Sequence, residues 1–154
     1  MARMIYAATM ALDGFIAGPG GDVTWLTGRP AVDEVIGRIG ALLMGHRTFA
    51  GALPLPPGRP WFVLTRHAAQ SPHPGVTFVD DFDTAVAAVR AAAGDGDVGV
   101  LGADVATQCL TAGLLDEVHV SVAPVLLGEG TRLFDLPVAG PLTLAPNVTI
   151  TRRP

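Results

Sequence analysis

Short apolar segments alternate with helical segments along most of this chain, and that alternation constrains the fold more than any other feature. Apolar runs that predict strands lie at 4–9, 41–44, 61–65, 76–79, 98–101 and 115–125. Patterns that predict helices lie at 31–39, 82–93 and 103–112. Strands separated by helices form right-handed βαβ units with parallel strands. We therefore expect a three-layer α/β/α fold around a mostly parallel central sheet.

Local signals refine this prediction at two places. The alanine-rich helix 82–93 follows Asp80 and Asp81, either of which can cap its first turn, and it ends at Gly94. The tail has β character at 132–136 and again at 142–152. The second of these segments resembles a terminal antiparallel strand. We therefore expect an antiparallel C-terminal edge on the sheet.

Composition excludes several classes of protein. The chain has 154 residues and no linker, which predicts a single domain over 1–154. Its net charge of −4, without a basic run, argues against nucleic-acid binding. It has no apolar stretch of about 18 residues and no evident signal peptide, so we expect a cytoplasmic protein that does not enter the membrane. The single Cys109 is expected to fill the core.

Three of the predicted strands end in segments that suit a phosphate group. These segments are Gly45–Thr48 after ALLM, Thr65–His67 at the end of WFVLT, and Gly102–Val105 after VGVL. Ligands of open parallel sheets bind outside the carboxyl ends of the strands. Each segment alone is compatible with an ordinary solvated turn. Together, two basic loops and a glycine turn at a helix start suit a phosphorylated dinucleotide, although neither GxGxxG nor a P-loop is present.

Four segments resemble the dihydrofolate reductase-like superfamily. Within it they are most similar to the riboflavin-biosynthesis reductase branch (RibD C-terminal domain-like) and its small stand-alone bacterial relatives. TMALDGFIAG, at Thr9–Gly18, resembles the opening strand and the flexible loop over the active site. LLMGHRTF resembles the branch's MGRRTF element, and FVLTR resembles the end of its third strand. The longest match runs from Gly102 to Phe134.

The resemblance implies a dihydrofolate reductase-like fold and an NADPH-dependent oxidoreductase. The hydride acceptor would be a pteridine- or pyrimidine-type ring, or the ribosylamino-pyrimidine of riboflavin biosynthesis, as for 5-amino-6-(5-phosphoribosylamino)uracil reductase. Residues carried over by position would hold the cofactor phosphates (Gly45, His46, Arg47, Thr48), its 2′-phosphate (Thr65, Arg66), its pyrophosphate (Gly102, Ala103, Asp104, Val105) and its nicotinamide (Thr9, Ile16, Ala17).

Three departures from the family pattern keep an alternative open. Leu101-Gly102 stands where the family has a Gly-Gly pair, and His46 stands where it favours arginine. The pathway enzyme also carries a deaminase domain with a zinc-type His/Cys signature, which this chain lacks. The missing signature counts against the riboflavin role and leaves an unrelated reductive role as an alternative. Leu101 and the uncertain proton donor favour the alternative function, a non-catalytic nucleotide- or ligand-binding protein that retains the fold. An enzyme that uses NADH is a further possibility.

The proton donor and the substrate contacts are less defined by sequence. Asp33, at the head of helix 31–39, is the candidate catalytic acid, and its alternative role is to favour the helix dipole. Asp13 is expected to shape its loop. Trp25 either covers the substrate, a small molecule, or belongs to the core. No His/Cys/carboxylate cluster suggests a metal.

The predicted strand 115–125 carries two further expectations. Small relatives in this branch form dimers, and Val118–Val125 is apolar enough to contribute to a homodimer interface. At the start of the strand, Asp116 and Glu117 are expected to be structural. His119 is expected to be exposed or to lie at an interface.

Overall fold

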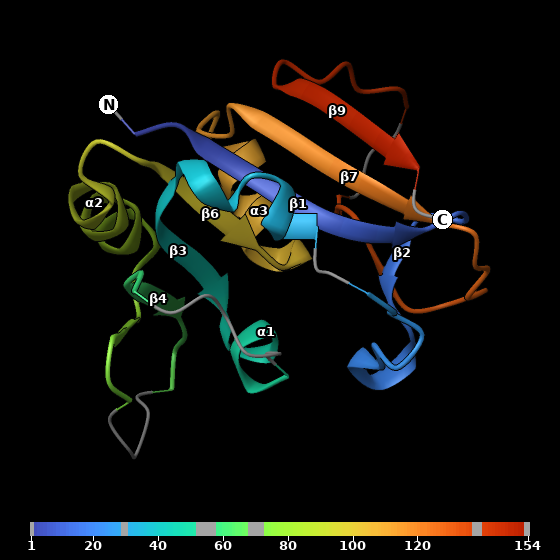
Figure 1. Ribbon diagram of the computed structural model, residues 1–154, viewed down its shortest axis with the longest axis horizontal. Coiled ribbons are helices and arrows are strands. Elements are labelled where there is room, and N and C mark those ends of the chain that lie inside the picture. The colour runs from blue at the N-terminus through green and yellow to red at the C-terminus, as the bar shows by residue number, and fades with distance from the viewer. Residues whose placement is uncertain (1, 29–30, 52–57, 68–72, 137–139, 153–154) are drawn as a thin grey trace.

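The computed structural model of the chain describes residues 2–28, 31–51, 58–67, 73–136 and 140–152. Within these ranges a seven-stranded sheet has the order β5-β4-β3-β6-β1-β7-β9, and every neighbouring pair is parallel (Figure 1). Its strands are β1 (Met4–Ala11), β3 (Ile39–Gly45), β4 (Trp61–Leu64), β5 (Val76–Val79), β6 (Asp97–Leu101), β7 (Glu117–Ala123) and β9 (Asn147–Arg152). A small antiparallel sheet pairs β2 (Phe15–Ala17) with β8 (Thr131–Arg132).

Helices cover both faces of the sheet. They are α1 (His46–Ala50), α2 (Phe82–Ala93) and α3 (Ala103–Thr111), with 3-10 turns η1 (Pro19–Gly21), η2 (Ala31–Glu34) and η3 (Ile36–Arg38). The prediction of a three-layer α/β/α fold with a mainly parallel sheet is confirmed. No helix in the described ranges is long and apolar enough to cross a membrane.

The expected antiparallel C-terminal edge is wrong. Strand β9 runs parallel to β7, so that Glu117 pairs with Asn147 and Ser121 with Thr151. The physical reason is the route of the connection. After β7 the chain crosses the α3 face, where Leu133 packs on the core, and it returns to the amino end of the sheet before β9 begins. Antiparallel pairing is instead found in the small β2–β8 sheet.

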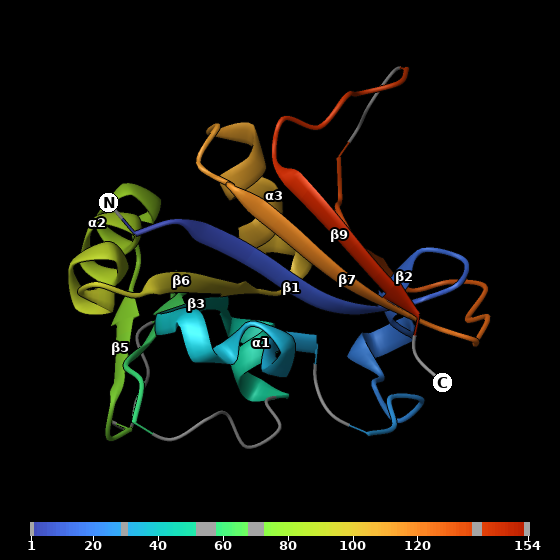
Figure 2. The ribbon, with the colours of Figure 1, turned by 45° about the horizontal axis from the view of Figure 1, so that its top comes forward.

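The direction of each connection decides which face it covers. Connections that move toward β5, from β1 to β3 and from β3 to β4, carry η2, η3 and α1. Connections that move toward β9, from β5 to β6 and from β6 to β7, carry α2 and α3. Because parallel crossovers are right-handed, the two directions place their helices on opposite faces. Figure 2 shows α3 on one side of the sheet and α1 with the 3-10 turns on the other.

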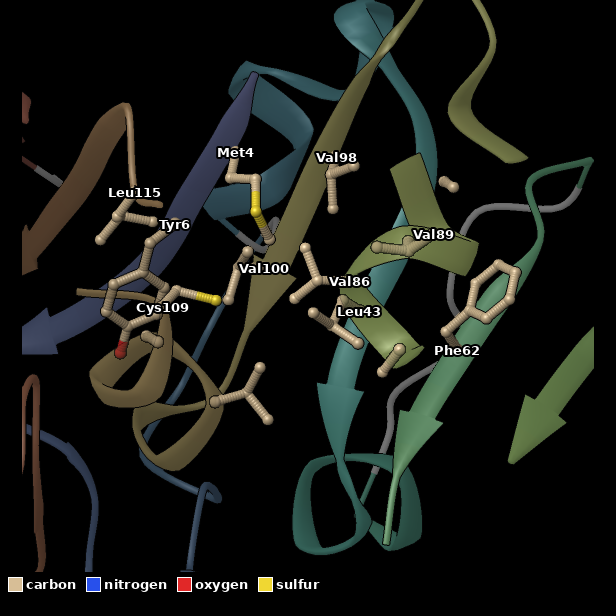
Figure 3. Close-up of a cluster of buried hydrophobic side chains, with 14 of the residues drawn as sticks. Met4, Tyr6, Leu43, Phe62, Val86, Val89, Val98, Val100, Cys109 and Leu115 are labelled. Atoms are coloured by element: carbon tan, nitrogen blue, oxygen red, sulfur yellow. The ribbon is translucent and has the colours of Figure 1, made fainter. Parts of the chain in front are cut away.

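The larger core cluster lies between the sheet and helices α2 and α3 (Figure 3). Sheet residues such as Met4, Val98 and Val100 are fully buried there. Tyr6 is also buried, and its hydroxyl donates a hydrogen bond to the carbonyl of Leu133 (2.8 Å). Cys109 of α3 points into the same cluster, and burial raises the pKa of its thiol to about 12. The thiol therefore stays protonated, and the prediction that it fills the core is confirmed.

The second cluster lies on the opposite face, under η2 and η3. The spacing of valine and isoleucine predicts one helix over 31–39, but the segment forms two 3-10 turns. Val35 lies between them with φ −115° and ψ −2°. Val35 and Gly37 both have low helix propensity, which favours the break. The apolar spacing still buries Val32 and Val35 against the sheet.

Helix α2 begins and ends at the predicted residues. The carboxylate of Asp81 accepts hydrogen bonds from the backbone N–H (2.8 Å) and the hydroxyl (2.7 Å) of Thr84. These bonds lower the pKa of Asp81 below its usual value. Asp81 is therefore the N-cap, and the helix ends where Gly94 takes a positive φ of 59°.

A charged network joins the amino ends of the central strands, and we call it the amino-end network. Arg38 donates to both carboxylate oxygens of Glu117 (3.0 and 2.8 Å) and to Asp97 (3.0 Å). Arg3 also forms an ion pair with Glu117. His119 Nε2 lies 2.8 Å from Glu117 Oε2. These residues begin or precede β1, β3, β6 and β7, so the network links the amino ends of the four strands.

The residues at the start of β7 can now be compared with the expectations from the sequence. Glu117 is structural, as expected, because it is buried beside two arginines. Asp116 is structural too, because its carboxylate accepts a hydrogen bond from the backbone N–H of Met4 (2.7 Å). His119 is mostly buried in this chain, with 15% of its side chain exposed. Burial and the nearby Arg38 guanidinium lower its pKa.

Candidate functional site

The three predicted phosphate-binding segments emerge side by side. Strands β4, β3 and β6 are neighbours, and their last residues lie level with one another. Gly45 pairs with Leu64, and Met44 pairs with Leu101. The loops that follow therefore leave one edge of the sheet together, which is the position expected for a ligand site in a parallel sheet.

Gly102 brings two of these loops into contact. It is the N-cap of α3 and has φ 92° and ψ 143°, a conformation that favours glycine. A Cβ at this position would lie 2.3 Å from Oγ1 of Thr48. A Cβ on Gly45 would lie 3.5 Å from the side chain of Val105, so the first turns of α1 and α3 approach each other at both places.

The start of α3 leaves backbone donors without a side-chain partner. No side chain of the described residues caps this helix, although the first N–H groups of any α-helix lack partners within the helix. Ala103 and Val105 are buried, whereas Asp104 is exposed and its carboxylate lies 3.4 Å from the amide of Gln108. The free N–H groups at this end can bind an anion.

Leu101 does not adopt the unusual backbone that a Gly-Gly pair would permit. No non-glycine residue in the described part of the chain has a positive φ. Leu101 is an ordinary last residue of β6, paired with Met44, and it packs against the second core cluster. The backbone irregularity is therefore confined to Gly102.

Basic side chains flank the Gly102 turn. His46 and Arg47 are exposed on α1, and Arg66 is exposed after β4. Within the described residues, none of these three side chains forms an ion pair or a hydrogen bond. Thr65 is buried, and its hydroxyl accepts a hydrogen bond from the N–H of His67 (3.1 Å), which fixes the turn that presents Arg66.

The predicted nicotinamide pocket begins where β1 extends beyond the end of β6. Thr9 is buried on this extension and pairs with Ser121 of β7, so both side chains share the face that η2 covers. Ile16 and Ala17 lie on β2, which follows directly, and both are half-buried. Figure 1 shows β2 and α1 at the same edge of the sheet, toward which the strand arrows point.

The loop after β1 is clamped to the turn after β7. The carboxylate of Asp13 accepts hydrogen bonds from the N–H groups of Leu127 (3.1 Å) and Gly128 (2.8 Å), and these lower its pKa. A Cβ on Gly130 would lie 2.0 Å from the carbonyl oxygen of Ala17. The prediction that Asp13 shapes its loop is confirmed.

Asp33 and Trp25 occupy different surroundings. Asp33 is half-buried on η2, the turn that packs on β1 and β7, and this residue already has an interaction within the protein. Asp33 and Thr9 lie on the same face of the sheet, so Asp33 is still the candidate acid. Trp25 is half-buried, and its indole N–H donates to the carbonyl of Asp22 (3.2 Å), which holds the ring in its own loop.

Two features of the site are missing from the sequence predictions. The first is the contact of Thr48 with the Gly102 turn, which joins segments that lie far apart in the chain. The second is buried Ser121 beside Thr9. The alternation of HVSVA places Ser121 on one face of its strand, but only the pairing of β1 with β7 brings it to Thr9.

Comparison with known proteins gives a consistent result. A family model of the RibD C-terminal domain matches residues 2–143. A crystal structure from Shewanella sp. PV-4, assigned to riboflavin biosynthesis, is similar with a TM-score of 0.72 and 25% sequence identity, covering 93% of this chain and 88% of that chain. No curated protein matches by sequence.

A second crystal structure is similar in fold. It is a diaminohydroxyphosphoribosylaminopyrimidine deaminase/5-amino-6-(5-phosphoribosylamino)uracil reductase from Thermotoga maritima, with a TM-score of 0.65 and 18% identity. The likeness covers 92% of the present chain and 51% of that one. The chain therefore spans about half the length of this bifunctional protein.

Proposed function

The chain belongs to the RibD C-terminal domain family, and from this premise we propose that it is an NADPH-dependent reductase. The proposed acceptor of the hydride is a pteridine- or pyrimidine-type ring, such as the ribosylamino-pyrimidine of riboflavin biosynthesis. The Thermotoga maritima structure supports the reductase class, because its name includes a reductase of such a compound.

The observation that carries the proposal is the close approach of Gly102 to Thr48. The backbone there leaves no room for a side chain, and α3 offers uncapped N–H groups at the same point. A pyrophosphate fits this chemistry, since it needs backbone donors and a close approach. Arg47 on α1 and Arg66 after β4 would supply positive charge for further phosphates.

The remaining roles follow from position. When bound, NADPH supplies the hydride, and the protein supplies binding and orientation. Thr9, Ile16 and Ala17 would line the nicotinamide pocket. The Asp13 clamp would hold the loop after β1 in place and so exclude water from this pocket. Asp33 would hold the proton that the reduced ring requires.

A single titration series tests the proposal. NADPH binding is followed by its fluorescence, and NADPH oxidation is then measured with dihydrofolate and with the ribosylamino-pyrimidine. Binding followed by turnover is the expected result. Binding without turnover would favour a non-catalytic protein that retains the fold. If millimolar NADPH neither binds nor raises the thermal stability, the proposal fails.

The choice of NADPH over NADH rests on Arg66. We expect Arg66→Ala to weaken NADPH binding about tenfold, because a charge-assisted hydrogen bond contributes about 1.5–3 kcal/mol. NADH binding should change little. Arg152→Ala, which removes the same charge from exposed β9, is the matched control. Equal losses for both cofactors would contradict the assigned role of Arg66.

A further inference from the structure

Two kinds of basic side chain lie beyond the carboxyl ends of β3 and β4. Arg47 and Arg66 carry a permanent positive charge, because a guanidinium is not deprotonated in proteins. His46 follows β3 directly, and an imidazole is charged only after it has bound a proton. All three side chains are exposed and have no partner within the described residues. The positive charge at this edge can therefore change with pH.

Helix α1 directs His46 toward β4. Successive residues of an α-helix are about 100° apart, so His46 and Thr48 face nearly opposite sides of α1. Thr48 faces the Gly102 turn after β6, because a Cβ on Gly102 would lie 2.3 Å from its Oγ1. Strand β3 lies between β6 and β4. His46 therefore faces the β4 side of α1.

The position of Phe49 gives the same orientation independently. Phe49 lies three residues after His46, and residues at this spacing share a face of a helix. Its ring packs edge-on against Trp61 of β4 and Phe78 of β5, with ring centroids 6.4 and 5.5 Å apart. The face of α1 that carries His46 is therefore turned toward β4 and β5.

Arg66 leaves the sheet beside His46. Gly45 pairs with Leu64, so the chain beyond β3 and the chain beyond β4 start level with each other. The turn at Thr65 then presents Arg66 to solvent. An imidazolium and a guanidinium on adjacent segments can both donate hydrogen bonds to one phosphate group.

The acidic side chains at this edge form no ion pair with His46 in the described part of the chain. They are Asp80 and Asp81 after β5, and Asp104 on α3. The Asp81 carboxylate caps α2, and that of Asp104 accepts a hydrogen bond from Gln108 (3.4 Å). Strands β3 and β4, on which α1 packs, carry no titratable side chain. The other titratable side chains near α1 are basic: Arg47, Arg66, His67 and His73. An anionic ligand would therefore favour a charged His46.

We propose that His46 takes up a proton when NADPH binds and that, together with Arg66, it holds the phosphate group that NADPH carries and NADH lacks. This inference rests on the proposed reductase function. The proton comes from the solvent, and the neutral imidazole becomes an imidazolium that donates to a phosphate oxygen. No electron moves in this step. The pyrophosphate, which both cofactors contain, is assigned to the Gly102 turn on the other side of β3.

The preference for NADPH over NADH then depends on pH. At low pH, His46 and Arg66 both carry a positive charge toward the phosphate, whereas at high pH only Arg66 does. NADH lacks this phosphate, so its binding should vary little over the same range. An arginine at position 46 would keep its charge and remove the dependence.

Isothermal titration calorimetry measures the proton directly. NADPH is titrated into the protein at about pH 7 in buffers of different ionisation enthalpy, and the apparent binding enthalpies give the number of protons taken up. We expect net uptake with NADPH and none with NADH. Equal uptake with both cofactors, or NADPH binding without uptake, would overturn the proposal.

His46→Arg is the matched variant, because it keeps a positive charge but has no proton to gain. Its remaining proton exchange belongs to the phosphate, which itself titrates near about pH 6. The unmodified protein should take up roughly half a proton more than this variant at about pH 7. Its NADPH affinity relative to His46→Arg should fall about fivefold between about pH 6 and pH 8. A ratio that does not change with pH would contradict the role of His46.

His67→Gln tests whether another histidine at this edge takes up the proton. His67 is exposed after β4, and its loss should leave the uptake unchanged. Loss of uptake in His67→Gln but not in His46→Arg would overturn the assignment to His46. Both histidines are exposed, so neither substitution should move the urea midpoint. Failure of the unmodified protein to bind NADPH would contradict the proposed function itself, whereas binding without uptake contradicts only the role of His46.

Discussion

The two ends of the sheet use the same kinds of charged side chain for opposite purposes. At the amino end, Arg3 and Arg38 are paired with Glu117, and Arg38 also binds Asp97. At the carboxyl end, Arg47 and Arg66 are exposed, and their side chains have no partner among the described residues. The charged groups at the amino end are therefore paired within the protein, whereas those at the carboxyl end are hydrated and free to bind a ligand.

Solvation explains why the two arrangements can coexist. Glu117 is buried, and a buried carboxylate is tolerated only when charged hydrogen-bond partners surround it. An exposed arginine remains hydrated and costs the fold little. The comparison predicts that substitutions at the amino end change stability, and that substitutions at the carboxyl end change binding.

The largest expected effect is on the amino-end network. Glu117→Gln should lower the free energy of unfolding by about 3 kcal/mol, because two arginines lose their charged partner. This is the low end of the range for buried pairs, since Arg3 and Arg38 are partly exposed. Urea denaturation measures the change. Asp95→Asn, an exposed acid near the same end, should stay within about 0.5 kcal/mol, and an equal loss there would refute the special role of Glu117.

The second-largest effect is an exception to this comparison, because Gly102 lies at the carboxyl end but supports the fold. Gly102→Ala should destabilise the protein by about 2 kcal/mol, from backbone strain and from the clash with Thr48. Adding Thr48→Ala should restore only the part due to the clash. Gly113 has a positive φ of 70° and open space around it. Gly113→Ala therefore shows the cost of a positive φ without a clash, about 1 kcal/mol. Urea midpoints that are the same for Gly102→Ala and Gly113→Ala would rule out the clash.

A smaller effect separates binding from stability. Arg47→Ala should weaken NADPH binding about tenfold, equivalent to about 1.4 kcal/mol, while the urea midpoint stays unchanged. Fluorescence titration and denaturation of the same sample measure both quantities. A shifted midpoint with unaltered NADPH binding would show that this end also serves the fold.

The smallest effect concerns pH at the amino end. The pKa of His119 is lowered in the folded protein, so the folded state favours the neutral ring. The stability contributed by this preference is present above the unfolded pKa of about 6.5 and is lost as the pH falls through that value toward the lower, folded pKa. His119→Gln should flatten the pH dependence of the urea midpoint in this window. An unchanged slope would assign the dependence to another group.

Local signals in the sequence predict a helix well where its ends depend only on neighbouring residues. Asp81 and Gly94 set both ends of α2, because capping depends on neighbours in the chain. The direction of β9 could not be predicted, because it depends on where the connection after β7 crosses the molecule. The prediction of one helix over 31–39 was wrong for a related reason. Apolar spacing identifies the buried face but does not distinguish a helix from two 3-10 turns.

The candidate site also has parts that the sequence predicts and parts that it does not. The three strand-end segments could be found from the sequence, because each is a short motif after an apolar run. The contact between Gly102 and Thr48 could not, since it requires the order of strands in the sheet. The partnership of Glu117 with Arg38 also joins distant parts of the chain, so the sequence alone indicates only that Glu117 starts a strand.

The strand order also has a consequence for how the chain folds during synthesis. Both neighbours of β1 come from the second half of the chain, since β6 begins at Asp97 and β7 at Glu117. Met4–Ala11 is therefore made first but stays unpaired until β6 and β7 have been made. Such non-local pairing slows folding and leaves an apolar strand uncovered on the nascent chain. The first strand to leave the ribosome is the one that most needs protection from aggregation.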